Sequence, residues 1–588
     1  MHALAALTLT ALVAGGLLGL GEMLGARSAG DRWVRGWTAL WWSVALIAQF
    51  AGPRPAVWAG FLVLGGGLWK AWGLTRGQPR PALMFGAALA AGAPLWLVPP
   101  YFYDALVYHL GFPWTWLANG SFATVAHNLF SHFPMAASTV FLLPVAIGLP
   151  EAAAGLHWAT FVIALVVLAR LAGRLGAGRY RWVAPVLVLG CWHATWIASV
   201  AAADQLVVLG VVLMVDHLAA HDESASERTL GIGLAFGLAV AAKYTAAIPA
   251  AAVLVVGCLA AASVTWPAAG LGIAVSSFWW VRNLVTTGNP VFPLLWTLLG
   301  GRGWSAPDNQ RYLALVQEGV GGLASVPAGL AHLVVPPNGL GWWAVAALPL
   351  VALALSGHDG ARRERRLVAL AVALALAAWL VTSQTIRYAL PLAALLAALA
   401  AAGLGRFGPR PARLVLALLG VTVALGVLNL AAFVFGVLGV GRLWRGAESA
   451  EAWRHSATVN DPLPAYRRCD VVLPKQARIL VVGDGRAWGC PRPHQVSSPY
   501  DEQLVQDVVE SSPTAAVAAQ RLRSAGFTHL LINWGEVARL GGPGYRVLRW
   551  RSRDADARWR DLLGEFTRPV FRKGSIEVRV LAGGPGGD

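Results

Sequence analysis

The sequence predicts an all-α polytopic membrane protein of about fourteen transmembrane helices, with a small α/β domain at its extracytoplasmic C-terminus. Three observations predict this fold class. The 588 residues are 57% hydrophobic and only 13% charged, whereas soluble domains carry roughly 25% charged residues. Apolar runs of about 20 residues, each long enough to cross a bilayer, follow one another along most of the chain. From residue 441 onward the composition becomes polar and charged.

The apolar runs of span length begin at the N-terminus. The first run, 3–24, has neither the basic start nor the small-residue cleavage site of a signal peptide, so we expect it to remain as a span. The other candidate spans are 36–51, 56–73, 82–98, 153–172, 182–200, 205–219, 229–245, 247–263, 266–281, 340–357, 367–382, 388–404 and 413–438. We expect the run 134–149 to lie at the outer interface, because a full span there would place the Arg-rich loop after residue 170 outside.

These spans divide the chain into four parts. The predicted parts are N-terminal transmembrane helices at 1–98, a first outer loop with juxtamembrane helices at 99–152, a transmembrane core at 153–440 with an outer loop at 283–339, and an extracytoplasmic soluble domain at 441–588. In the last part, short β-type runs at 477–482, 529–532 and 576–581 alternate with a helical stretch near 513–525. Such alternation is typical of a small α/β domain.

The distribution of basic residues argues against a nucleic-acid partner. The formal net charge is +17, but Lys occurs only four times among the 46 basic residues, and many Arg lie in short loops between apolar runs. A phosphate-binding arm would gather its basic residues in one polar segment. Arg in short loops instead indicates the cytoplasmic side of a lipid bilayer. The loop 362–366 is therefore expected inside, and the N-terminus and the C-terminal domain outside.

The four cysteines do not have the spacing of a metal site. Cys469 and Cys490 lie in the polar tail, where a disulfide between them is expected if the tail is outside the cytoplasm. Nothing in the sequence shows that their side chains meet.

Five ionisable residues fall at the outer ends of the predicted spans: Asp104, Asp204, Lys243, Arg282 and Arg387. A charge near the bilayer interior costs roughly 2.5–3.5 kcal/mol by insertion scales, so such residues are candidates for function. Two carboxylates with three cations suit a negatively charged substrate, together with proton transfer or metal binding. The structural alternatives are helix caps, a snorkelling lysine and interfacial arginine anchors. The sequence has no Walker loop, nucleophile elbow or zinc-protease motif.

Five segments in a fixed order carry a resemblance to a known family. They are Asp104-Ala-Leu-Val-Tyr108-His109-Leu, Ala203-Asp204-Gln205, the glycine-containing 237–242 ending in Lys243-Tyr244-Thr, Arg282-Asn283 followed by Gly288-Asn-Pro-Val-Phe-Pro293, and Arg387-Tyr388 followed by Pro391. Together they resemble the glycosyltransferase C superfamily. Within it, the sequence is similar to the bacterial polyprenyl-phosphate-sugar-dependent transferases related to the aminoarabinose transferase and the protein mannosyltransferases.

The resemblance implies an inverting transfer of a sugar from a polyprenyl-phosphate donor to an envelope glycan, lipid or protein, at the outer face of the bacterial cytoplasmic (inner) membrane. It implies that Asp104 and Asp204 are catalytic, with Asp104 orienting or deprotonating the acceptor hydroxyl. The substrate-binding residues that it implies are Tyr108, His109, Lys243, Tyr244, Arg282, Asn283, Arg387 and Tyr388. No cofactor is certain. A divalent metal ion stays open, although the first loop has no second acidic residue beside Asp104.

Two other functions stay open. A secondary transporter or lipid flippase would show broken helices near the midplane and inverted repeats, and the sequence shows neither. A catalytically inactive relative that serves as an assembly factor would not need the full set of charged residues. The sequence specifies neither the sugar nor the acceptor.

Overall fold

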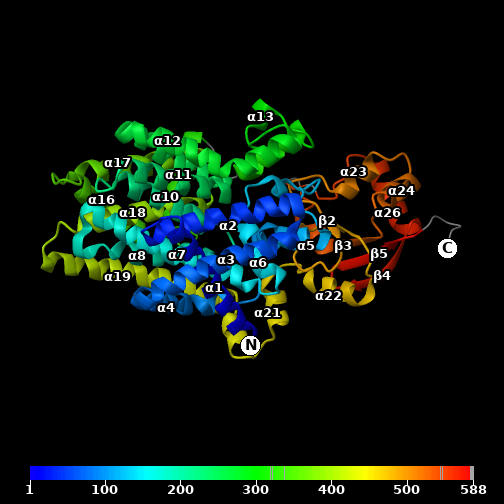
Figure 1. Ribbon diagram of the computed structural model, residues 1–588. Coiled ribbons are helices and arrows are strands. Elements are labelled where there is room, and N and C mark those ends of the chain that lie inside the picture. The colour runs from blue at the N-terminus through cyan, green and yellow to red at the C-terminus, as the bar shows by residue number, and fades with distance from the viewer. Residues whose placement is uncertain are drawn as a thin grey trace.

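The computed structural model describes residues 1–582 except 78, 318, 319, 321, 337, 543 and 546; for 74–77, 79 and 323 only the backbone is described. The chain forms a helical bundle, and a smaller domain that contains the sheet stands at one end of it (Figure 1). This smaller domain is formed by the C-terminal part of the chain, coloured golden yellow to red in Figure 1.

The first half of the bundle contains α1 (His2–Met23), α2 (Ala29–Ala51), α3 (Pro53–Gly77), α4 (Pro79–Trp96), α5 (Gly111–Asn119), α6 (Ala136–Ala146), α7 (Glu151–Ala172), α8 (Val183–Leu189), α9 (Trp192–Ala198), α10 (Asp204–Leu218) and α11 (Ala225–Ala242). The second half contains α12 (Ala247–Thr287), α13 (Trp296–Leu299), α14 (Ala306–Val316), α15 (Val326–Val334), α16 (Trp343–Ser356), α17 (Arg362–Thr382), α18 (Leu390–Leu404) and α19 (Pro409–Ala431).

Six helical stretches of the described chain are long and apolar enough to cross a membrane. They are His2–Met23, Glu151–Tyr180, Tyr244–Thr287, Arg362–Thr382, Ile386–Leu404 and Pro409–Val437. The chain is therefore a multi-pass membrane protein. The other predicted spans also form helices, and the number of fourteen spans stays a prediction.

Helix α12 comprises two of the predicted spans, because the chain reverses inside it. Ala261 has non-helical dihedral angles, φ −156° and ψ 63°. A Cβ atom added at Gly257 would lie 2.8 Å from Oγ1 of Thr265, although eight residues of straight helix would separate the two by about 12 Å. The predicted division into 247–263 and 266–281 therefore matches two antiparallel helices joined at a sharp turn.

The predicted span 182–200 is broken, which corrects the expectation of unbroken spans. Its first part is α8 and its second part is α9, and Gly190 and Cys191 separate them. The break packs tightly on α19, since a Cβ added at Gly426 would lie 1.8 Å from the carbonyl oxygen of Gly190. Two apposed glycines let the backbones approach this closely.

The run 134–149 forms α6, a helix of 11 residues that is almost entirely buried. It lies in the same hydrophobic core as α2 and α7, through side chains such as Phe141 and Leu142. Its length is short of the roughly 20 residues that a span needs, as the prediction of a juxtamembrane helix requires.

The C-terminal domain is a five-stranded mixed sheet with helices. Its strands are β1 (Ile479–Val482), β2 (His494–Val496), β3 (His529–Asn533), β4 (Thr567–Lys573) and β5 (Ile576–Leu581). The strand order is β2-β1-β3-β5-β4; β1 runs parallel to β2 and β3, and β5 runs antiparallel to β3 and β4. The helices of this region are α20 (Val440–Trp444), α21 (Ala450–Ala457), α22 (Leu463–Val472), α23 (Leu504–Glu510), α24 (Ala515–Ser524), α25 (Trp534–Leu540) and α26 (Arg553–Glu565). The α/β prediction is confirmed.

The expected disulfide of the C-terminal domain is absent. Cys469 and Cys490 are both free and buried, and they lie in one hydrophobic cluster with Tyr466 and Ile479 on one side of the sheet. Burial in an apolar cluster gives each thiol a packing role that needs no bridge.

Candidate active site

The first ion pair of the candidate site joins Asp104 to Arg387. Asp104 ends the segment after α4 and immediately precedes a π-helical turn at Ala105–His109, while Arg387 lies in the short helix Ile386–Ala389 just before α18. Nη1 of Arg387 lies 2.5 Å from Oδ2 of Asp104, and the hydroxyl of Tyr108 donates to the same oxygen at 2.7 Å. Among the described residues, the other carboxylate oxygen of Asp104 makes no hydrogen bond.

The second ion pair joins Asp204 to Lys243. Asp204 is the first residue of α10, and Lys243 is the residue at which α11 ends in an extended conformation. Nζ of Lys243 donates to Oδ1 of Asp204 at 2.8 Å, and the Asp204 side chain is only 3% exposed. His157 supports the start of α10, because its Nε2 accepts from the backbone N–H of Gln205 at 2.9 Å.

The ring of Tyr388 brings the two pairs into one cluster. Nζ of Lys243 lies 5.2 Å from the centroid of this ring, and Cζ of Arg387 lies 5.5 Å from it. Such distances permit cation–π attraction for both cations. Four of the five ionisable residues that were predicted at the outer ends of the spans therefore lie in one cluster: Asp104, Asp204, Lys243 and Arg387.

Two polar atoms of this cluster are buried without a hydrogen-bond partner among the described residues: Oδ2 of Asp204 and Nε2 of His109. His109 is 4% exposed, and its other ring nitrogen lies 3.4 Å from the hydroxyl of Ser138. An unpaired buried polar group costs about 1–3 kcal/mol. These atoms are therefore suited to receive hydrogen bonds from a bound polar molecule.

Arg282 and Asn283 lie near the end of α12 and contact the first outer loop at Ser131 and His132 rather than at Asp104. Arg282 donates to the carbonyl of Ser131 and stacks 4.6 Å from the ring centroid of Trp279. Nδ2 of Asn283 donates to the carbonyl of His132 at 2.8 Å and to the hydroxyl of Tyr244 at 2.9 Å. In the described part of the chain, neither residue makes a hydrogen bond or ion pair with the four charged residues above.

The C-terminal domain adds an aromatic wall that the sequence did not predict. Tyr500, in the loop after β2, lies 5.5 Å from both Phe130 and Tyr312, measured between ring centroids. Phe130 in turn lies 5.1 Å from Tyr108, the residue that donates to Asp104. Residues from the first outer loop, from α14 and from the C-terminal domain therefore meet beside the first ion pair. No local pattern around Tyr500 indicates this contact.

The loop that carries Tyr500 is fastened to the first outer loop. The backbone N–H of Leu129 donates to Oδ2 of Asp501 at 2.7 Å, and Nη2 of Arg311 donates to the carbonyl of Tyr500 at 2.8 Å. Burial raises the pKa of Asp501 to about 7, although the hydrogen bonds from Ser498 and Leu129 act in the opposite direction. This fastening therefore contains a carboxyl group that titrates near neutral pH.

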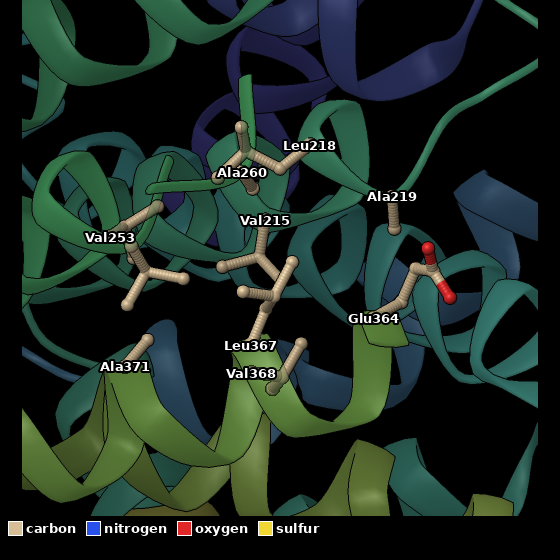
Figure 2. A pocket seen from close by; sticks show the side chains of 10 residues that line it. Val215, Leu218, Ala219, Val253, Ala260, Glu364, Leu367, Val368 and Ala371 are labelled. Atoms are coloured by element: carbon tan, nitrogen blue, oxygen red, sulfur yellow. The ribbon is translucent and has the colours of Figure 1, made fainter. Parts of the chain in front are cut away.

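A hollow at the opposite end of the bundle has a different character. It lies between α10, α12 and α17 (Figure 2), and Glu364 is the charged residue among those that line it. Glu364 is hydrogen-bonded to Nε2 of His221 at 2.7 Å. The other lining residues are Ala, Val and Leu. Because this hollow gathers no set of charged groups, the candidate active site is the cluster around Asp104 and Asp204.

No protein-family model and no curated protein sequence matches this chain. Solved structures do share its fold. ArnT from Cupriavidus metallidurans in the apo state is similar with a TM-score of 0.56 and 15% identity, over 86% of this chain and 99% of that chain. ArnT from the same organism bound to undecaprenyl phosphate is similar with a TM-score of 0.54 and 12% identity, over 86% of this chain and 100% of that chain. The chain therefore shares the fold of these ArnT structures, and at the level of the fold they agree with the predicted resemblance.

Proposed function

We propose that this protein is an inverting membrane glycosyltransferase that moves a sugar from a polyprenyl-phosphate donor to an acceptor at the outer face of the cytoplasmic membrane. The observation that carries the proposal is the pair of ion pairs, Asp104–Arg387 and Asp204–Lys243, gathered around Tyr388. They lie in the fold of ArnT, a protein whose solved structure binds undecaprenyl phosphate.

The two cations suit the leaving group of this reaction. When the bond between the anomeric carbon and the phosphate oxygen breaks, its electron pair stays on the polyprenyl phosphate. Arg387 and Lys243 supply fixed positive charge in a buried setting, where such stabilisation is strongest. Each cation is paired with a carboxylate, so the site is close to neutral before the donor arrives.

Asp104 suits the role of base. Its Oδ2 is engaged by Arg387 and Tyr108, which fixes the carboxylate, and the other oxygen is left for an acceptor hydroxyl. The acceptor oxygen would bond to the anomeric carbon while its proton passes to Asp104. A single displacement of this kind inverts the anomeric centre and needs no covalent enzyme intermediate. Asp204 is assigned a secondary role, since its Oδ1 is occupied by Lys243 and its Oδ2 is buried.

The remaining predicted residues receive narrower roles. His109 presents an unpaired ring nitrogen, and Tyr388 presents its ring between the cations, so both are assigned to the sugar phosphate. Arg282 and Asn283 donate to the carbonyls of Ser131 and His132 in the first outer loop. The hydroxyl of Tyr244 donates to the carbonyl of Phe292 and accepts from Asn283. The three residues are therefore assigned to the shape of the site rather than to direct phosphate contact.

The residues at Asp104 do not fit a metal site. Its polar neighbours are a guanidinium and a phenol hydroxyl, whereas divalent cations prefer several carboxylate or carbonyl oxygens. Within the described residues, no three His, Cys, Asp or Glu side chains gather as a metal-ligand group. The proposed mechanism therefore contains no step through a metal ion.

A donor panel tests the proposed function. The full chain, purified in lipid nanodiscs, is incubated with undecaprenyl phosphates that each carry one common hexose or pentose, together with lipid and peptidoglycan fragments as acceptors. We expect release of undecaprenyl phosphate from at least one donor, with the sugar transferred to an acceptor as the opposite anomer. Absence of release from every donor, under conditions where the protein is folded, would favour the transporter alternative.

A further inference from the structure

The C-terminal sheet has, at the carboxyl ends of β1 and β3, the position where ligands commonly bind in α/β domains. After β1 the chain moves to β2 on one side, and after β3 it moves to the other side of the sheet. The crevice beyond the carboxyl ends of two such strands is the common ligand position in open parallel sheets. Gly483–Arg486 follows β1, and Trp534–Glu536 follows β3, so these segments border the crevice.

This crevice contains a side chain of the membrane bundle. The ring centroid of Tyr103 lies 5.4 Å from Cζ of Arg486 and 5.4 Å from Cζ of Arg539. Both distances are within the range of cation–π attraction. Tyr103 directly precedes Asp104 in the chain. The crevice at the carboxyl ends of β1 and β3 is therefore occupied by Tyr103, the residue next to the proposed base Asp104.

The two guanidiniums are held rigidly. Arg486 donates to Asp484 from Nε at 2.8 Å and from Nη2 at 2.7 Å, and both side chains are at most 1% exposed. Arg539 donates to Glu536 from Nε at 2.9 Å and from Nη2 at 2.6 Å. Two-point pairs of this kind fix the plane of a guanidinium as well as its position. The ring of Tyr103 therefore contacts two guanidiniums whose positions are set by these ion pairs.

The C-terminal region also forms hydrogen bonds with the backbone on both sides of Asp104. Nε of Arg454 donates to the carbonyl of Pro100 at 2.8 Å, and the backbone N–H of Trp488 donates to the carbonyl of Leu106 at 3.3 Å. Between these two contacts, Tyr103 and Asp104 begin a short helical turn that continues as the π-helical turn Ala105–His109. No long helix therefore holds Asp104 in place, and the contacts with the C-terminal region add to this short turn.

We propose that the C-terminal domain positions the base, with Tyr103, Arg486 and Arg539 as positioning residues that set Asp104 against Arg387. This inference rests on the proposed function for its catalytic consequence, but the structural coupling is independent of it. A reacting group that is misplaced by 1 Å can cost about 10²-fold in rate. Loss of the contacts of Tyr103 with Arg486 and Arg539 should therefore lower the rate of sugar transfer without removing any group that touches the donor.

The test uses Tyr103→Leu, Tyr103→Phe and a matched control in the full chain. Tyr103→Leu removes the ring, and we expect kcat to fall about 10- to 100-fold, while the Kd for undecaprenyl phosphate stays within about threefold. Tyr103→Phe keeps the ring, so kcat should fall by less than about threefold. The control is Tyr180→Leu, which removes a ring 4.8 Å from Arg179 at the other end of the bundle and should leave kcat unchanged.

Hydrogen exchange gives a readout that does not depend on turnover. In Tyr103→Leu we expect the amides of 104–109 to exchange at least about tenfold faster than in the unmutated chain, and in Tyr180→Leu we expect no change there. Arg539→Gln, whose side chain is 42% exposed, serves as a second variant if Tyr103→Leu does not accumulate, with a smaller change in the same direction. Unchanged exchange in both variants would overturn the inference. If the unmutated chain releases no undecaprenyl phosphate, the proposed function fails and the exchange result still decides the coupling.

Discussion

Both ends of the bundle bury charged side chains, but the two ends use them differently. At the end away from the C-terminal domain, Asp216 is fully buried and faces two guanidiniums, Arg170 at 2.6 Å and Arg174 at 3.4 Å. His217 beside it contacts the carboxylate of Asp31 at 2.8 Å. At this end, one carboxylate is shared between two cations, and its neighbour is paired as well.

At the end that faces the C-terminal domain, each carboxylate has a single cationic partner, and acceptor atoms remain available. Asp204 keeps one buried oxygen without a described hydrogen-bond partner, and Asp104 keeps one oxygen outside its ion pair. Both oxygens of Asp216 lie within ion-pair distance of a guanidinium, although neither makes a hydrogen bond of good geometry. Among the described residues, one oxygen of Asp104 and one of Asp204 face no cation. A carboxylate enclosed by cations fixes helices to one another, whereas one with an oxygen left over has capacity for a ligand. Buried charge and unmet hydrogen bonds therefore occur at both ends, and what differs is the carboxylate oxygen that has no cationic partner.

The largest effect is expected from replacing Asp104, which tests whether the end that faces the C-terminal domain is the catalytic one. In Asp104→Asn the amide keeps the size of the side chain and an acceptor for Tyr108, but it loses the charge and the basicity. We expect sugar transfer to fall about 10²- to 10⁴-fold, the usual cost of removing a general base. The measurement is the single-turnover rate of release from the donor that the unmutated chain uses. A rate close to normal would show that Asp104 is not the base.

The counterpart at the other end is Asp216→Asn, which should affect stability and leave transfer intact. Removal of one partner from a buried ion pair typically costs about 3–5 kcal/mol, so the apparent thermal midpoint in detergent should drop clearly. Asp216 lies twelve residues after Asp204 on α10, which is about 18 Å along a helix. We therefore expect kcat per folded molecule to change less than about twofold. A large loss of kcat with an unchanged midpoint would reverse the assignment of the two ends.

The smallest predicted effect concerns Asp501, whose carboxyl group links the C-terminal domain to the first outer loop through the backbone N–H of Leu129. Its pKa is raised from 3.8 to about 7, so the folded chain keeps a proton that the unfolded chain loses. Stability should therefore fall as pH rises from about 4 to about 7 and stay reduced above that. Asp501→Asn should remove this part of the pH dependence. Thermal midpoints at pH 5.5 and 8 would show a smaller difference in the variant; equal differences in both chains would contradict it.

The sequence predicted those features that depend on local cost or local pattern. Charges at the ends of apolar runs are expensive, so Asp204 and Lys243 stand out from the residue pattern alone. Strands β1, β3 and β5 were predicted from their short apolar runs. Strand β4 contains Pro569 and three charged residues, Arg568, Arg572 and Lys573. This composition is typical of an edge strand and hides it from a search for apolar runs.

The features that sequence could not predict depend on contacts between distant segments. The contact of Arg387 with Asp104 specifically, and of Tyr500 with Phe130, follows from the packing of separate elements. The break between α8 and α9 lies within one mostly apolar run, so the residue pattern shows no boundary there, and the close approach of Gly190 to Gly426 appears only in the structure. The expected Cys469–Cys490 bridge was wrong because shared location in a domain does not establish a bond.

The central claim is that the end of the bundle facing the C-terminal domain binds the polyprenyl phosphate. It is tested most directly by photo-labelling the full chain with undecaprenyl phosphate that carries a diazirine in its first isoprene unit, followed by peptide mapping. We predict labelling of peptides that contain Asp104 or Arg387, reduced by excess unlabelled undecaprenyl phosphate. Competable labelling confined to the other end, around Asp216 or the hollow beside Glu364, would contradict the claim.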